Sequence, residues 1–128
     1  MCIRDRFYGT TGVNQKTSYF IPLDLKGKQD IISNFEKCFH ANNCIMLKEG
    51  RMYTCTVAAN IEHFNKFYNQ NLQLTEFDSI DIHKAKSFSD IVEFLAKPIP
   101  FCRYCNVQGR EFGHTWGQSK KEISEWSK

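Results

Sequence analysis

The sequence predicts an α+β fold, a small β-hairpin with short flanking helices, and three observations support this class. Two apolar segments flank Glu49-Gly50, as the arms of a hairpin flank a two-residue turn. Apolar residues recur at helical spacing over residues 60–69. Ser87 and Asp90 form a helix start signal. With 128 residues, 41% of them hydrophobic, the chain has the size of one domain that can bury a core.

The N-terminal part of the chain contains one strand signal and one ambiguous segment. Tyr19-Phe20-Ile21 is a short apolar run that Pro22 ends, which is typical of a strand. Residues 30–35 are predicted either as a short helix or as an irregular approach to Cys38. Met1 to Arg6 differ in composition from the segment after them, and we interpret them as non-native residues, so Cys2 is set aside.

A hairpin is predicted over residues 44–55. With Glu49-Gly50 as its turn, the pairing places Cys44 directly opposite Cys55. Opposed residues hold their Cβ atoms roughly 4.5–5.5 Å apart, a spacing that suits two ligands of one metal centre. Gly50 fits the turn because a primed turn requires positive φ, which glycine adopts without strain.

Three further elements come after the hairpin. The helix over 60–69 has an apolar face formed by Ile61, Phe64, Phe67 and Tyr68. Residues 78–83 alternate as a strand, with Ile80 and Ile82 on one side. The helix that Ser87 and Asp90 begin has its apolar face at Ile91, Phe94 and Leu95, and Pro98 ends it.

A last short helix is predicted near the end of the chain. Ser119 and Glu122 have the spacing of a capping box, and Ile123 with Trp126 supplies an apolar stripe.

Five cysteines dominate the functional interpretation: Cys38, Cys44 and Cys55 in one stretch, then Cys102 and Cys105 as a Cys-x2-Cys knuckle. Thiolates select zinc, copper(I) or iron–sulfur clusters over hard cations. The knuckle serves zinc and iron–sulfur sites alike. A structural zinc site prefers two compact knuckles, and the sequence has one, so the asymmetry favours a cluster held partly by the hairpin.

Two other interpretations of the cysteines carry less weight. Buried free cysteines often behave as small hydrophobic residues. A Cys44–Cys55 disulfide fits the hairpin geometry if the chain is exported.

Composition excludes several function classes. The net charge is only +3 and the basic residues are scattered, so nucleic-acid binding is not predicted. No apolar run approaches the roughly 20 residues that span a bilayer, and the first residues lack a signal-peptide core, so we expect no membrane partner and a cytoplasmic location. Disulfides are rare there, which favours metal binding.

The cysteine pattern resembles a known family. Cys38-x11-Gly50-x4-Cys55 followed by a late Cys-x2-Cys is similar to the auxiliary-cluster region, of the SPASM or shorter twitch type, that follows the barrel of radical S-adenosylmethionine enzymes. The resemblance spans about residues 20–126, and 97–105 and 116–126 are similar to one bacterial branch of that region. It implies that residues 7–37 end a partial α/β barrel and that 38–128 form an iron–sulfur domain.

The resemblance also implies a cofactor. Because no cysteine follows Cys105, the twitch type with one [4Fe–4S] cluster is implied, rather than the two clusters of the full SPASM type. The Cys-x3-Cys-x2-Cys motif of the cluster that reduces S-adenosylmethionine is absent, so S-adenosylmethionine and a second [4Fe–4S] cluster are expected only in an intact, longer enzyme. The substrate of that enzyme is unknown, and this chain alone is not expected to be active.

The ligand set stays open between two choices. The twitch resemblance implies Cys38, Cys55, Cys102 and Cys105, whereas hairpin geometry retains Cys44. The alternative from a different class, a structural zinc module for protein binding, uses Cys44, Cys55, Cys102 and Cys105.

Several other side chains are candidates for supporting roles. Arg103 and Tyr104, inside the knuckle, are candidates for contact with the metal ligands. A solvent-facing loop arginine is the favoured interpretation of Arg103, and tuning of the cluster or binding of an anionic substrate group is the alternative. His40 is either a further ligand or a solvated loop residue, and His63 is expected on the exposed side of its helix. No function is predicted for His83 or His114. The apolar cover of the site is expected from Phe101, Phe112, Trp116 and Trp126.

Overall fold

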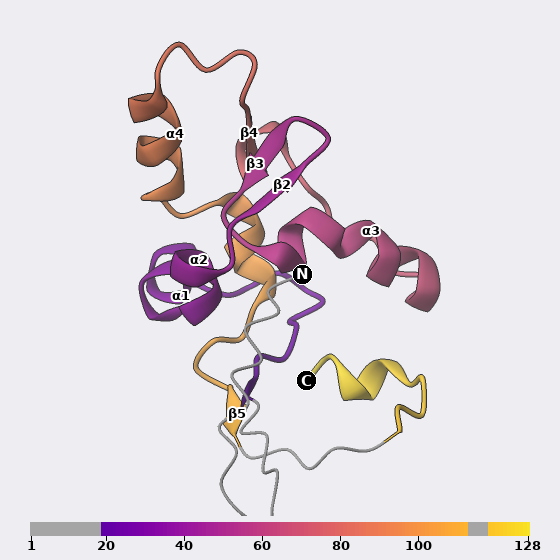
Figure 1. The fold of residues 1–128 in the computed structure, drawn as a ribbon. Coiled ribbons are helices and arrows are strands. Elements are labelled where there is room, and N and C mark those ends of the chain that lie inside the picture. Colours follow the sequence, from indigo (N-terminus) through magenta and orange to yellow (C-terminus); the bar gives the residue numbers. More distant parts are fainter. Residues whose placement is uncertain (1–18, 113–117) are drawn as a thin grey trace, which may run out of the picture.

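The protein has an α+β fold in the computed structural model, which describes residues 19–112 and 118–128 (Figure 1). A three-stranded antiparallel sheet has the order β2 (Met46–Lys48), β3 (Arg51–Tyr53) and β4 (Ser79–Asp81). A separate antiparallel ribbon pairs β1 (Tyr19–Phe20) with β5 (Glu111–Phe112). The predicted fold class is confirmed. The expected segment 1–6 lies outside the described residues.

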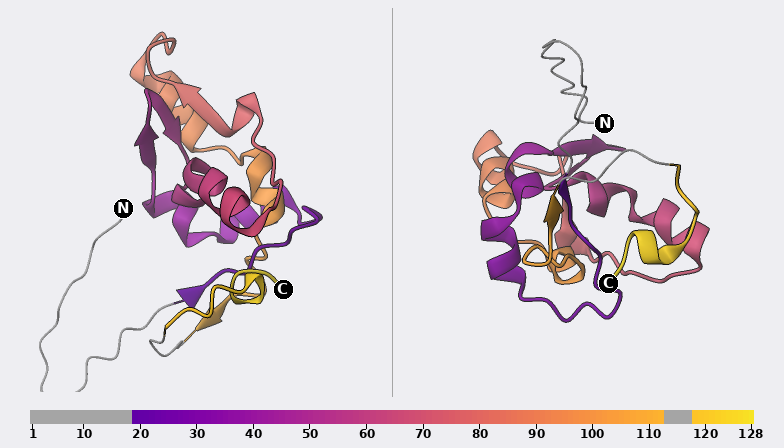
Figure 2. Two further views of the ribbon diagram at one scale, coloured as in Figure 1. Left: turned by 90° about the vertical axis from the view of Figure 1, so that its right-hand side faces the viewer. Right: turned by 90° about the horizontal axis from the view of Figure 1, so that it is seen from below.

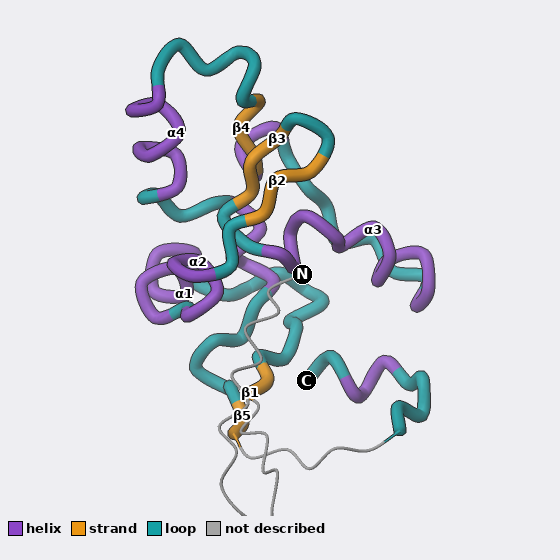
Figure 3. The backbone as a smooth tube through the Cα atoms, viewed as in Figure 1, coloured by secondary structure: helices purple, strands orange, loops and turns teal. Residues whose placement is uncertain are grey.

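The described residues also form four α-helices and three short 3₁₀ helices. The α-helices are α1 (Ile31–Lys37), α2 (Phe39–Asn43), α3 (Thr56–Tyr68) and α4 (Phe88–Leu95). The 3₁₀ helices are η1 (Glu76–Asp78), η2 (Pro100–Tyr104) and η3 (Ile123–Glu125). In Figures 1 and 3, α1 and α2 lie on one side of the sheet's lower end and α3 on the other, and η2 runs between them.

The predicted hairpin is confirmed in its register and its turn. Lys48 pairs with Arg51, and the pairing extends outward to Met46 and Tyr53. The turn residues both have left-handed backbones, with φ of 51° at Glu49 and 73° at Gly50, as a type I′ turn requires.

The predicted continuation of the hairpin to Cys44 and Cys55 is wrong. The ladder ends before them because their backbones belong to helices. The Cys44 N–H donates to the carbonyl of His40 at 2.8 Å and ends α2, while the carbonyl of Cys55 accepts from Ala59 N–H at 3.3 Å and begins α3. These two cysteines are therefore helix caps and not a cross-strand pair.

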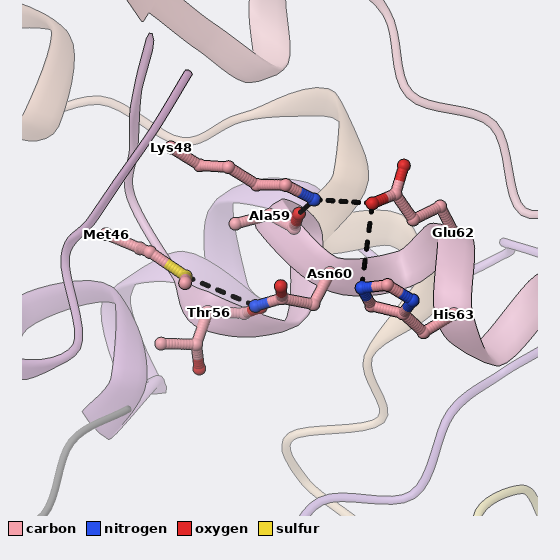
Figure 4. Close-up of polar contacts among 7 residues, drawn as sticks. All are labelled: Met46, Lys48, Thr56, Ala59, Asn60, Glu62 and His63. Carbon is pink, nitrogen blue, oxygen red and sulfur yellow. Dashed lines mark hydrogen bonds and ion pairs between the residues drawn. The ribbon is translucent and has the colours of Figure 1, made fainter. Parts of the chain in front are cut away.

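Two polar side chains fix the hairpin to the first turns of α3 (Figure 4). The Lys48 ammonium donates to the carbonyl of Ala59 at 2.9 Å and to the Glu62 carboxylate at 2.5 Å. The Asn60 amide donates to the sulfur of Met46 at 3.2 Å. Because α3 begins at Cys55, these contacts set the position of that cysteine relative to the sheet.

Helix α3 begins earlier than periodicity predicted, because Cys55 caps it. The Cys55 sulfur accepts from the N–H of Ala58 at 3.4 Å. Of the predicted apolar face, Ile61 is buried, whereas Phe67 is 61% exposed, so the buried face of the helix does not include Phe67. The helix ends at Asn69, whose left-handed backbone terminates it.

The two predicted capping boxes have opposite outcomes. At α4, Ser87 and Asp90 exchange both hydrogen bonds, as predicted. Near the C-terminus, Ser119 instead donates to the carboxylate of Glu125 at 2.7 Å, and no side chain caps η3. The predicted Ser119–Glu122 box is wrong because Glu125 also accepts from the N–H of Lys120, which closes a local turn around that carboxylate.

The core lies where the N-terminal segment, α3 and η2 meet (Figure 2). Its buried members are Leu23, Ala58, Ile61, Leu72, Ile99, Phe101 and Tyr104. The backbone of Asp24 donates to the carbonyl of Tyr104 at 2.7 Å, and α1 packs against η2. The cysteine knuckle is therefore built into the core rather than carried on a surface loop.

Candidate metal centre

Four cysteine side chains line one cavity beside the core. Cys38 lies between α1 and α2, Cys55 caps α3, Cys102 lies in η2, and Cys105 ends η2. The other lining residues are Asn34, Ala41, Thr54, Ile99, Phe101 and Val107. The structure thus brings together thiols from three distant segments of the chain in largely apolar surroundings.

The thiols of the cavity interact electrostatically with one another. Burial raises the pKa of Cys55 to about 11, and the neighbouring Cys102 and Cys38 add to the increase. Burial raises the pKa of Cys105 well above its ordinary value, with Cys55, Cys102 and Cys38 as further causes. Cys55 and Cys105 therefore hold their protons at neutral pH unless a cation binds and releases them.

Cys102 has an additional negative neighbour. Burial raises its pKa to about 11, and the charges of Cys38 and Asp78 contribute to the increase. Asp78 is fully buried, and its carboxylate accepts from the N–H of Phe101 at 2.6 Å and from the N–H and hydroxyl of Thr75 at 2.6 and 2.9 Å. This carboxylate fixes the residue that precedes the knuckle.

Cys44 is separate from this group. It is buried at the end of α2 but does not line the cavity. No disulfide joins any two of the five cysteines within the described residues, so the alternative Cys44–Cys55 bridge is not present. Within residues 19–112 and 118–128, no group of three or more His, Cys, Asp or Glu side chains is arranged to hold a single metal ion.

Asn34 on α1 clamps the knuckle. Its side-chain amide donates to the carbonyl of Cys102 at 2.8 Å and also to the carbonyl of Cys105. Asn34 is 4% exposed, so both hydrogen bonds are shielded from water. The sequence does not indicate this role of Asn34, because one asparagine in a short helix carries no signal of a contact so distant in the chain.

Arg103 and Tyr104 do not line the cavity. The Arg103 guanidinium lies 4.8 Å from the centre of the Tyr104 ring and donates to its hydroxyl at 3.0 Å. Tyr104 is buried against Phe101, with ring centres 5.2 Å apart. A Cβ at Gly27, whose φ is +61°, would lie 2.7 Å from the Tyr104 ring, so the close approach requires glycine. These two side chains therefore pack against each other and against the segment at Gly27.

The histidines differ in their surroundings. His40 lies on α2, half-buried, and burial lowers its pKa, so the interpretation as a solvated loop residue is wrong. His63 is exposed on α3, as predicted, with its Nε2 3.6 Å from the Glu62 carboxylate. His83 is exposed beside the hairpin turn at Gly50. His114 lies outside the described residues.

The predicted apolar cover is only partly present. Phe101 is 1% exposed and lines the cavity. Phe112 is 72% exposed and Trp126 is 43% exposed, and neither lines the cavity, so their predicted role is wrong. Both belong to the region of the β1–β5 ribbon, where Trp126 packs against Phe20. Trp116 is outside the described residues. Ile99 and Val107, both buried, take the place of the wrongly predicted residues.

Comparisons of the chain with models of protein families, with curated proteins and with solved structures give no match. Within the described part of the chain, the helices are all too short or too polar to cross a membrane.

Proposed function

We propose that this chain binds one [4Fe–4S] cluster through Cys38, Cys55, Cys102 and Cys105. The observation that supports the proposal is the presence of these four thiols in one buried, mostly apolar cavity. Four cysteine thiolates are the usual ligands of such a cluster, and the donor set therefore fits the group. Bound there, the cluster would supply one-electron redox chemistry.

The residues of the chain have distinct roles in this proposal. The four sulfurs would hold the cluster, and Asn34 fixes the knuckle that carries two of them. Ile99, Phe101 and Val107 limit the access of water. Because one cysteine is available for each iron, the ligand set leaves no iron open for a substrate, which favours electron transfer over substrate binding as the role of the site.

The family assignment is part of the same proposal. The resemblance of the cysteine spacing supports an auxiliary-cluster domain of a radical S-adenosylmethionine enzyme, with residues 7–37 as the end of its barrel and 38–128 as the cluster domain. The radical step and the binding of S-adenosylmethionine belong to the intact enzyme, whose substrate is unknown. A cytoplasmic location is proposed with it, because a reducing compartment keeps the thiols available.

Anaerobic reconstitution with iron and sulfide tests the proposal. We expect a brown protein that absorbs near ~400 nm and contains about four irons per chain. A colourless protein with one tightly bound zinc would instead establish the structural zinc module. A chain that retains neither metal nor colour would overturn both.

A further inference from the structure

Thr54 is a buried polar residue without an assigned partner beside the four cysteines. It follows β3 and directly precedes Cys55. Thr54 is one of the residues that line the cavity, it is 1% exposed, and its hydroxyl has no hydrogen-bond partner within the described part of the chain. Buried hydroxyl groups normally have a partner, because an unpaired one has lost its hydrogen bonds to water and gained none.

The surroundings of Thr54 offer few acceptors. Ala41, Ile99, Phe101 and Val107 contribute apolar side chains to the cavity. The side-chain NH₂ of Asn34 donates to the carbonyls of Cys102 and Cys105, and the side-chain oxygen of Asn34 does not pair with the Thr54 hydroxyl. The other acceptors among the lining side chains are the cysteine sulfurs, which become strong acceptors only when they are deprotonated.

We propose that the Thr54 hydroxyl donates a hydrogen bond to a sulfur of the bound cluster, either an inorganic sulfide or a ligating thiolate, and so raises the cluster's reduction potential. This inference rests on the proposed function. Reduction adds negative charge to the cluster sulfurs, so a hydrogen bond to sulfur stabilises the reduced form more than the oxidised form. Thr54 is then a tuning residue, distinct from the four ligands.

The test compares the wild type with Thr54→Val and Thr54→Ser after anaerobic reconstitution. Valine keeps the shape of threonine and removes the hydroxyl, whereas serine keeps the hydroxyl. The midpoint potential is measured by redox titration of the visible absorbance. We expect a shift to more negative potential in Thr54→Val and a value close to the wild type in Thr54→Ser. Thr56→Val, which alters a threonine outside the cavity lining, is expected to leave the potential unchanged.

A second measurement separates tuning from a structural role. Without metal, Thr54→Val removes a buried hydroxyl that lacks a partner, so its unfolding midpoint should equal or exceed that of the wild type. With the cluster bound, the same substitution removes a hydrogen bond, so the gain in stability on cluster binding should be smaller than in the wild type. If the role of Thr54 were structural, Thr54→Val would lower the unfolding midpoint both without metal and with the cluster bound.

The outcomes distinguish this inference from the proposed function. A wild type that binds about four irons, with equal potentials in the Val and wild-type proteins, overturns the role of Thr54 and leaves the cluster site intact. A wild type that binds zinc or no metal overturns the cluster site and the role of Thr54 together. If Thr54→Val does not fold, Thr54→Ala is used in its place as a second variant without the hydroxyl. Its midpoint potential is expected to shift in the same, more negative direction.

Discussion

The side-chain amide of Asn34 donates to the carbonyl oxygen of Cys102 at 2.8 Å, although the two residues are 68 positions apart in the sequence. The same amide donates to the carbonyl of Cys105. One side chain on α1 therefore holds both ends of the cysteine knuckle, and the sulfurs of the knuckle keep a fixed direction toward Cys38 and Cys55.

Asn34→Asp should weaken both the fold and metal binding. Aspartate has nearly the same shape but cannot donate when ionised, and its charge would face two carbonyl oxygens. We expect the free energy of unfolding to fall by about 2–3 kcal/mol and the metal affinity to fall about 10–100-fold. Urea denaturation and metal titration measure the two effects.

Asn71→Asp is the matched control for this substitution. Asn71 is exposed, and its side-chain oxygen accepts from the Gln73 amide, which a carboxylate can also do. We expect little change in stability or metal binding. Equal effects of the two substitutions would show that the Asn34 amide does not fix the knuckle.

Cys38→Ala and Cys44→Ala should differ in cluster content. Cys38 lines the cavity and Cys44 does not, so Cys38→Ala should lose the absorbance near ~400 nm and most of the iron. Cys44→Ala should retain both, with a modest loss of stability, because Cys44 is buried in the fold. Iron and sulfide analysis of the reconstituted proteins measures this, and the reverse result would place Cys44 in the ligand set.

Asp78→Asn should destabilise the protein more than Asp90→Asn. Both carboxylates accept hydrogen bonds from a capping box, but Asp78 is fully buried and also accepts from the N–H of Phe101. An amide in its place directs an NH₂ group at neighbouring donors, at a cost of about 2–3 kcal/mol. The half-buried Asp90 should lose about 1 kcal/mol. Chemical denaturation at neutral pH compares them, and equal losses would contradict the role assigned to Asp78.

The metal-free protein should lose stability in alkaline solution. The pKa values of Cys55 and Cys102 are about 11 in the folded state and near 9 without the effects of folding. The folded state therefore binds more protons between these values, and stability is fully present below about pH 9 and lost as pH rises toward about 11. Each thiol contributes a slope of about 1.4 kcal/mol per pH unit in that window.

Urea denaturation at a series of pH values under reducing conditions measures this slope. Cys55→Ala lacks one of the three thiols whose pKa is raised, so its stability should decline less steeply with pH than that of the wild type. A stability that is constant from about pH 9 to 11 would mean that the thiols are not desolvated in the folded protein.

Local patterns in the sequence predicted the elements that depend on neighbouring residues. The turn at Glu49-Gly50 and the capping box at Ser87 were predicted correctly, because turn and cap chemistry involve residues a few positions apart. The sequence did not decide whether Cys44 belongs to the cavity, because the short helix α2, which ends at Cys44, has no apolar periodicity.

Long-range contacts account for the rest of what the sequence did not predict. Asn34 and Asp78 reach the knuckle from distant segments, and neither position has a local pattern that indicates its partner. Phe112 and Trp126 were assigned to the cover because they are large and apolar, yet the tertiary fold places them away from the cavity. Apolar character alone does not say which surface a residue covers.

The arrangement of the four cysteines on three distant segments also has a kinetic consequence. The site cannot form until α1, the start of α3 and η2 have met, and contacts of such long sequence separation form slowly because loop closure costs entropy. A group bound by all four sulfurs would therefore cross-link the chain between Cys38 and Cys105. Its loss would shorten the lifetime of the folded state, because segments that took longest to assemble would be released together.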